Sequence, residues 1–257
     1  MKRRSRTLDR GSPFLLLALI LLLWQIVVVA FSVPDFIFPS PLQIARQFGE
    51  FGGPLFEAAW KTFWVTLLGF GLSIAVGVLL GLLVGSSRAA YAALYPLLVG
   101  FNAVPKAALV PILVVWFGIG LGPGILTAFQ ISFFPITVNL ATGLATLEPE
   151  LEDVLRVLGA RRWDVLVKVG LPRSMPYFYG SLKIAITLAF VGTVLAEMTA
   201  GDSGIGYLMQ TAGSQQRMPL AFAGLVTIGA MAMAMYELFS WVEKRTTGWA
   251  HRGSQAG

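Results

Sequence analysis

The chain has 257 residues, of which 56% are hydrophobic and only 12% are charged, and its net charge is +6. An ordinary soluble domain carries about twice that share of charged side chains, so the composition excludes a soluble enzyme with a polar exterior. It also excludes a disordered chain, which would be polar and poor in aromatic residues. Because the chain lacks cysteine and has a single histidine, His251, we expect no disulfide and no metal site.

Apolar runs long enough to cross a bilayer occur six times. A membrane helix needs about 20 mostly apolar residues, and the runs cover residues 14–31, 63–87, 89–117, 125–147, 184–200 and 219–242. We therefore expect an all-α polytopic membrane protein with six transmembrane helices. Residues 13–243 would form one transmembrane domain between a basic tail, 1–12, and a second tail, 244–257. The first run is longer than the apolar part of a signal peptide, which favours an uncleaved anchor.

The basic residues are distributed unevenly between the two sides of this predicted domain. Fifteen of the 19 Lys and Arg residues fall on the side of the two termini, and three fall on the opposite side. Loops rich in Lys and Arg stay in the cytoplasm. The sequence therefore predicts that both termini are cytoplasmic.

The segment between the first two runs predicts a short helix on the outer surface. Ile44, Phe48, Phe51 and Leu55 recur at helical spacing, and we expect this helix to pack against the bundle.

The second run carries small residues spaced by four, which place them on one helix face. Small residues allow two helix backbones to approach closely in a membrane. We therefore predict a tight helix–helix seam at Gly69, Ser73, Gly77, Gly81 and Gly85.

The largest inner segment, residues 148–183, is long for a connection between spans. Apolar residues form an amphipathic stripe at Leu147, Leu151, Val154, Leu155 and Leu158. We expect Gly159 to end or bend this helix and a second short helix, residues 163–169, to stop at Leu171-Pro172. The segment predicts a docking site for a partner; the alternative is a solvated connector.

Polar groups inside the third and fifth runs are the candidates for a transport path. Lys106 is a charge within a span, where it is costly unless it faces protein or water. Pro105 and Pro111 deprive nearby carbonyls of helical partners, and Asn102 lies one turn earlier. Lys106 could line an aqueous path and attract an anion, or it could be a structural lysine capped by those carbonyls or paired with a carboxylate. Glu197 fits a structural or gate contact better than a ligand.

The inner segment resembles the EAA loop of ABC importer permeases. That pattern reads Glu-Ala-Ala, three residues, Gly, nine residues, Ile, one residue, Leu-Pro. Gly159, Val169, Leu171 and Pro172 keep this spacing, while Asp153-Val154-Leu155 replaces the opening triplet. The resemblance implies a type I ABC importer permease-like fold with cytosolic coupling helices. It implies that an ATPase docks on Asp153, Leu158, Gly159, Ala160, Arg161, Trp163, Val169, Leu171 and Pro172.

Other segments are similar to the nitrate, sulfonate and taurine branch of these permeases. They are Pro39-Ser40-Pro41, residues 104–111, Trp116-Phe117-Gly118-Ile119-Gly120, Ala196-Glu197-Met198 and residues 204–208. The resemblance implies a bacterial inner-membrane subunit with three partners: an ATPase, an extracytoplasmic solute-binding protein and a second permease copy, with a homodimer expected. The solute would be small and anionic, such as a sulfonate, taurine or nitrate; a pyrimidine-type vitamin precursor or a flavin is the alternative.

No phosphate-binding G-x-x-x-x-G-K-[ST] loop occurs in the sequence. We therefore expect this chain not to be an enzyme, and ATP and Mg²⁺ to be bound by the partner ATPase. A secondary transporter is the competing hypothesis, and it would predict internal repeats with broken helices. A membrane enzyme would need a convergent catalytic set, which is not visible in the sequence.

Overall fold

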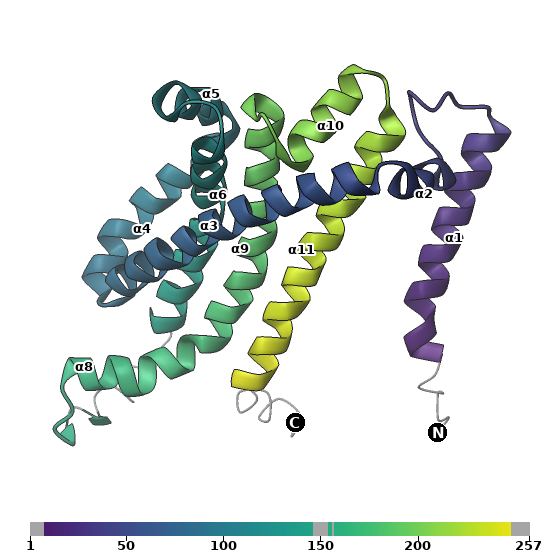
Figure 1. Ribbon diagram of the computed structural model, residues 1–257. Helices are drawn as coiled ribbons and strands as arrows, with labels where there is room; N and C mark the ends of the chain where they lie inside the picture. Colours follow the sequence, from purple (N-terminus) through teal and green to yellow (C-terminus); the bar gives the residue numbers. More distant parts are fainter. Residues whose placement is uncertain (1–7, 146–153, 156, 248–257) are drawn as a thin grey trace.

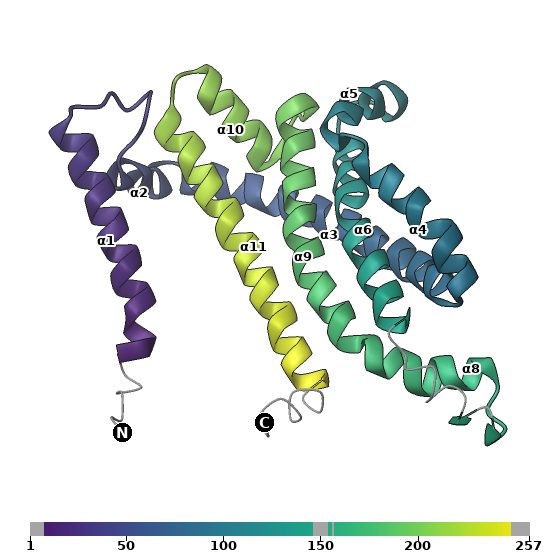
Figure 2. The same ribbon diagram turned by 180° about the vertical axis from the view of Figure 1, so that it is seen from behind.

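The computed structural model describes residues 8–145, 154–155 and 157–247, and in these ranges the chain is helical, without strands (Figures 1 and 2). In chain order the helices are α1 (Leu8–Ala30), α2 (Pro41–Glu50), α3 (Gly52–Gly85), α4 (Arg88–Ala103), α5 (Lys106–Phe117), α6 (Leu121–Ala145), α8 (Arg162–Val165), the π-helical turn η1 (Leu166–Gly170), α9 (Leu171–Ala200), α10 (Gly204–Ser214) and α11 (Met218–Thr246).

Within the described ranges, five helices are long and apolar enough to cross a membrane. They cover Pro13–Ala30, Gly52–Gly85, Leu121–Ala145, Trp163–Ala200 and Met218–Thr246. A sixth crossing would be made by α4 and α5 together, which are bent by 82° at the short break between them. The predicted all-α, multi-span architecture is confirmed, and the predicted third span is a broken one.

The outer part of α3 differs from the prediction. The helix begins at Gly52 rather than near residue 63, and the predicted outer helix is divided at Phe51 between α2 and α3. Glu57 and Lys61, which precede the predicted start of the span, lie one turn apart and form an exposed salt bridge of 3.0 Å. The helix continues through this pair, and α3 is roughly 50 Å long at 1.5 Å per residue.

The helix α2 packs against the bundle, as predicted. Ser40 caps its N-terminus: the Ser40 hydroxyl accepts from the N–H of Gln43, and the Ser40 N–H donates to the Gln43 side chain at 2.7 Å. Ile44 is buried in a cluster with Ile205 of α10 and Leu220 of α11. The outer ends of these helices therefore share one core.

The predicted seam of small residues is confirmed, and its partner is α6. A Cβ added to Gly69, Gly77, Gly81 or Gly85 would lie only 2.6 to 3.0 Å from the Cβ atoms of Ala128, Ile136, Leu140 and Leu144, respectively. At the fifth position of the stripe, the Ser73 hydroxyl is 2.6 Å from the Ser132 hydroxyl. The backbones of α3 and α6 thus approach as closely as the side chains allow.

The helix α6 also packs against α9, which in turn contacts α11 (Figure 2). Gly192 brings α9 close to α6, since a Cβ there would lie 2.8 Å from the Cα of Ala128. Lys183 of α9 forms a salt bridge of 2.7 Å with Glu243 of α11. These side chains are only 18% and 12% exposed, so the pair fixes the two helices together within the protein.

The inner end of α9 differs from the prediction. A helix was expected to stop at Leu171-Pro172, but it continues without interruption from Trp163 to Ala200. The π-helical turn η1 directly precedes this position, and Pro172 is the second residue of α9. The part of the inner segment from Trp163 onward is therefore continuous with a transmembrane helix.

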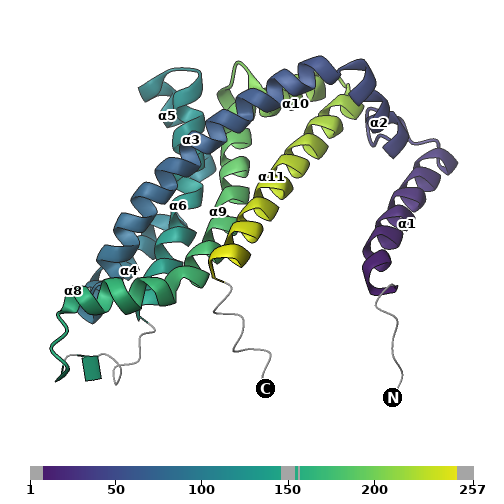
Figure 3. The same ribbon diagram turned by 60° about the horizontal axis from the view of Figure 1, so that its bottom comes forward.

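The helix α1 stands apart from the bundle in all three views (Figures 1 to 3). Most of its large side chains are exposed, and they are apolar, as expected for contact with lipid. Its outer end is attached through Trp24, whose ring stacks on Phe38 and also contacts Phe222 of α11.

Candidate functional site

The inner segment reverses direction at Gly159. The N–H of Ala160 donates to the carbonyl of Leu155 at 3.0 Å, and Gly159 has a positive φ of 86°. This is the hydrogen bond of a Schellman motif, in which glycine is favoured at the left-handed position. The expectation that Gly159 ends the helix is confirmed. The space around its Cα is open, since a Cβ there would meet no atom within 4 Å.

Large apolar side chains surround this turn and are not covered. Val157 is 88% exposed, and Val154, Leu158 and Trp163 also expose more than half of their surface. In Figure 1 this region, with α8, lies at the end of the molecule opposite α5 and α10. An exposed apolar cluster of this kind marks an interaction site.

The other residues assigned to coupling by resemblance are divided along this segment. Arg161 and Pro172 are exposed, whereas Ala160, Val169 and Leu171 are half-buried. Asp153 lies outside the described residues. Asp164, which the sequence did not single out, accepts from the N–H of Arg161 at 3.3 Å and pairs with Lys168 at 2.8 Å. It therefore orders the start of α8.

Lys106 lies at the break between α4 and α5. Its ammonium group donates to the carbonyl of Phe101 at 3.3 Å and contacts both the backbone carbonyl and the side-chain oxygen of Asn102. The lysine thus caps the carbonyl end of α4, as one of the two structural alternatives predicted, and no carboxylate pairs with it among the described residues. Asn102 and Lys106 are brought together as expected.

Glu197 lies elsewhere, at the outer end of α9, and is buried. Its carboxylate accepts from the Thr62 hydroxyl of α3 and, at 2.9 Å, from the N–H of Gly206 in the first turn of α10. The Thr62 hydroxyl accepts in turn from the N–H of Ile205 at 2.8 Å. Glu197 therefore caps the N-terminus of α10, where a negative charge is favourable.

Two glycines at the start of α10, Gly204 and Gly206, lie directly against Glu197. Gly204 has a φ of 93°, and a Cβ on Gly204 would collide with the Glu197 carboxylate. A Cβ on Gly206 would lie 2.7 Å from the Cβ of Glu197. The Gly204-Ile205-Gly206 sequence thus lets the start of α10 close over the carboxylate.

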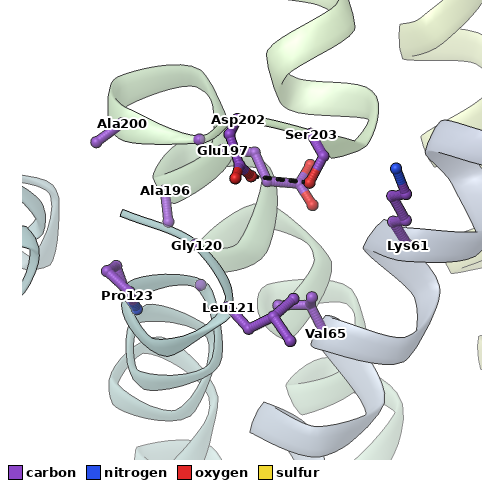
Figure 4. A pocket seen from close by; sticks show the side chains of 12 residues that line it. Lys61, Val65, Gly120, Leu121, Pro123, Ala196, Glu197, Ala200, Asp202 and Ser203 are labelled. Atoms are coloured by element: carbon purple, nitrogen blue, oxygen red, sulfur yellow. Dashed lines mark hydrogen bonds between the residues drawn. The ribbon is translucent and has the colours of Figure 1, made fainter. Parts of the chain in front are cut away.

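Two neighbouring outer cavities contain residues that the sequence analysis missed. Lys61, Asp202 and Ser203 line both cavities, and Glu197 lines the smaller one (Figure 4). The larger one, about 350 Å³, is a groove between α3 and α10 that also contains Tyr207 and Arg217. Lys61 lies within α3, Asp202 and Ser203 lie in the loop before α10, and Arg217 lies just before α11, so these residues come from distant parts of the sequence. Glu197 lines the smaller of these two cavities, whereas Asn102 and Lys106 line neither of them.

The chain matches a known protein family over most of its length. Residues 73–248 match the family described as "Binding-protein-dependent transport system inner membrane component". The chain belongs to this family of ABC importer permeases.

Individual relatives are similar to this chain over almost its whole length. A probable ABC transporter permease protein of Haemophilus influenzae is 33% identical over 91% of this chain and 95% of its own length. The riboflavin transport system permease RibX of Chloroflexus aurantiacus is 32% identical over 96% and 94%. The putative aliphatic sulfonates transport permease SsuC of Bacillus subtilis is 28% identical over 91% and 86%.

A solved structure shares the fold. The chain of the MetNI methionine ABC transporter in an inward-facing conformation matches with a TM-score of 0.61, at 19% identity, over 76% of this chain and 94% of that chain. The type I importer fold that the EAA-like loop implied is therefore confirmed.

Proposed function

We propose that this permease is the membrane subunit of an ATP-driven importer and that its inner turn transmits the movement of a partner ATPase. The observation that carries the proposal is the uncovered apolar cluster Val154, Val157, Leu158 and Trp163 around Gly159. Trp163 begins the helix that continues to Ala200, and the other three residues precede it across the turn at Gly159. A partner that binds this cluster would therefore move a transmembrane helix when it changes conformation. ATP and Mg²⁺ would be bound by that partner, because this chain has no phosphate-binding loop.

The orientation of the chain follows from the same arrangement. The Leu8 end of α1, the Thr246 end of α11 and α8 lie at one end of the molecule (Figure 1), and α2, α5 and α10 lie at the other. The first end carries most of the Lys and Arg residues, so it belongs in the cytoplasm together with both termini. An extracytoplasmic solute-binding protein would deliver the solute to the opposite end, and a second copy of the chain would complete the path.

The break between α4 and α5 is the proposed position of the solute path. Non-helical backbone within a membrane is tolerated where it faces protein or a water-filled passage. Asn102 and Lys106 hold this break and would face the passage. Glu197 is proposed as a positioning residue for α10 rather than a ligand, because its carboxylate is engaged by Thr62 and Gly206.

The solute class is proposed from the relatives and from Lys106. The Lys106 ammonium group, which suggested an anionic solute, is already hydrogen-bonded to carbonyls of α4, so it favours an anion less strongly. The relative named for riboflavin is more similar to this chain than the one named for aliphatic sulfonates. We therefore favour a flavin or a related heterocyclic vitamin, with a sulfonate as the second candidate.

Purification of the tagged chain from its native membrane in mild detergent tests the proposal. We expect a P-loop ATPase to co-purify and the eluate to hydrolyse ATP. Leu158→Asp should release the ATPase, whereas Lys168→Ala, on the neighbouring exposed surface, should not. If the chain purifies alone and ion gradients drive uptake in vesicles, it is a secondary transporter and the proposal fails. Uptake of labelled riboflavin and of an aliphatic sulfonate by cells with the whole transporter separates the two solute classes.

A further inference from the structure

The groove between α3 and α10, here called the outer groove, is a formed pocket to which the proposed function assigns no ligand. One face of α10 lines it, with residues spaced three or four apart: Gly204, Tyr207, Leu208, Thr211 and Ala212. Its volume is about 350 Å³. Sites for small molecules in proteins span about 300–1,000 Å³, so the groove is large enough for one such molecule.

The floor of the outer groove is apolar and fixed by the packing of the bundle. Ala58 of α3, Ala212 of α10 and Leu220 of α11 line the groove and belong to the buried cluster that joins the outer ends of these helices. Because such a cluster is close-packed, the floor keeps its shape when the groove is empty. A preformed apolar floor favours a ligand with an extended or flat apolar body.

Two opposite charges lie at the two ends of the outer groove. Asp202, before α10, accepts a hydrogen bond of 2.9 Å from the hydroxyl of Ser203, and Arg217, after α10, lies over the ring of Phe51 at 4.5 Å. In the part of the chain that the structure describes, neither charge forms a salt bridge. The 11 residues of α10 between them measure roughly 16 Å at 1.5 Å per residue. This spacing fits an elongated ligand with hydrogen-bond donors at one end and acceptors at the other.

The middle of the outer groove offers an aromatic ring and little net charge. Tyr207 lines the groove between the two ends and is 42% exposed, so one face of its ring is free for stacking. On the opposite wall, Lys61 and Glu57 of α3 neutralise each other in a salt bridge of 3.0 Å. The middle of the groove therefore favours an uncharged aromatic ring system.

The outer groove adjoins a smaller cavity that leads toward the broken span. Lys61, Asp202 and Ser203 line both cavities, and the smaller one, about 20 Å³, also reaches Gly120 and Leu121 at the turn between α5 and α6 (Figure 4). A solute in the groove would thus lie beside the hairpin that carries the proposed path.

We propose that the outer groove binds the transported solute on the outer side of the permease, and that this solute is a flat heterocycle with a hydroxylated chain, as in a flavin. The chain hydroxyls donate to Asp202, the ring stacks on Tyr207, and ring carbonyls accept from Arg217. This inference rests on the proposed function for the direction of transport and for the choice of a flavin, and it adds a site on this chain.

Protection of a single thiol tests the site. This chain has no native cysteine, so a substitution gives it a unique thiol. Gln215 lines the outer groove and the adjacent Ser214 does not, although both are exposed. In the purified transporter, without a solute-binding protein, we expect riboflavin to slow the reaction of a maleimide with Gln215→Cys and not with Ser214→Cys. An aliphatic sulfonate should protect neither thiol, and protection by the sulfonate alone would overturn the flavin class.

Removal of the stacking ring tests the orientation of the ligand. Tyr207→Ala should weaken the binding of riboflavin, measured by equilibrium dialysis, by about threefold to tenfold. Tyr177→Ala is the matched control, because Tyr177 is 45% exposed and lies outside the groove. Equal affinities of the two variants would overturn the stacked position.

Failure of the groove site and failure of the importer assignment give different results. If the complete transporter takes up riboflavin but riboflavin does not protect Gln215→Cys, the groove site is wrong and the importer assignment stands. If a solute-binding protein protects the thiol and riboflavin does not, the groove contacts that protein and the solute site is likewise wrong. A chain that purifies without an ATPase overturns the importer assignment, whereas protection by riboflavin would still support the groove site.

Discussion

The hydroxyl of Thr62 on α3 donates to the carboxylate of Glu197 on α9, with both carboxylate oxygens 2.9 Å away. The same hydroxyl accepts from the N–H of Ile205 at the start of α10. One side chain thus links three helices at the outer end of the bundle. Thr62 is fully buried, so water cannot replace these bonds.

Removal of the Thr62 hydroxyl should destabilise the permease. Thr62→Val keeps the shape of the side chain but leaves the Ile205 N–H and part of the carboxylate unsatisfied, which costs about 1–3 kcal/mol. Thr62→Ser keeps the hydroxyl and should be closer to the wild type. The thermal unfolding midpoint in detergent measures both variants. An unchanged midpoint for Thr62→Val would show that the link does not stabilise the outer end.

The seam between α3 and α6 allows a matched pair of substitutions within one helix. A Cβ at Gly77 would lie 2.9 Å from the Cβ of Ile136, whereas a Cβ at Gly71 meets nothing within 4 Å. Gly77→Ala should therefore cost about 1–3 kcal/mol through overpacking. Gly71→Ala should be neutral or stabilising by up to about 1 kcal/mol, because alanine favours helix. Denaturant titration of the two purified variants measures the difference, and equal stabilities would contradict the tight seam.

The seam could be predicted from the sequence because its signal is local: small residues every fourth position define one helix face whatever the partner. The link at Glu197 could not, because Thr62 is far away in the sequence and nothing near Glu197 indicates which helix supplies the hydroxyl. The Gly204-Ile205-Gly206 pattern was noticed as a resemblance, but its role as the space for a carboxylate depends on the packing of α9 against α10.

The boundaries that were predicted wrongly have a common physical cause. The second span was expected to begin at residue 63, although Glu57 and Lys61, four residues apart, pair on the helix and leave it intact. Pro172 was interpreted as a helix end, although a π-helical turn before it accommodates the ring. In both places a helix was expected to begin or end, but the sequence did not show which neighbouring residues would allow the helix to continue.

The proposed orientation predicts which thiols a membrane-impermeant reagent reaches. Val157 is exposed at the inner turn, and Gln215 is exposed at the rim of the outer groove. In intact spheroplasts a charged maleimide should label Gln215→Cys at once and Val157→Cys only after permeabilisation. The cysteine-free parent chain is the control. The reverse order of labelling would place the termini outside and invalidate the assignment of the ATPase surface.

Two substitutions at Gly159 distinguish the turn from the space around it. Gly159 has a φ of 86°, and most other residues pay about 1–2 kcal/mol to adopt that conformation, whereas asparagine adopts it more readily. Because a Cβ on Gly159 would meet nothing within 4 Å among the described residues other than its chain neighbours, neither Gly159→Trp nor Gly159→Asn should prevent folding or membrane insertion. Gly159→Trp should abolish uptake and its coupling to ATP hydrolysis, since it both strains the turn and adds bulk where the ATPase would dock. Gly159→Asn should retain most uptake if the reversal of the chain is what the site requires. Normal uptake by Gly159→Trp would show that the turn is not part of the surface that couples to the ATPase. Loss of uptake in Gly159→Asn with the ATPase still bound would show that the partner contacts the glycine backbone directly.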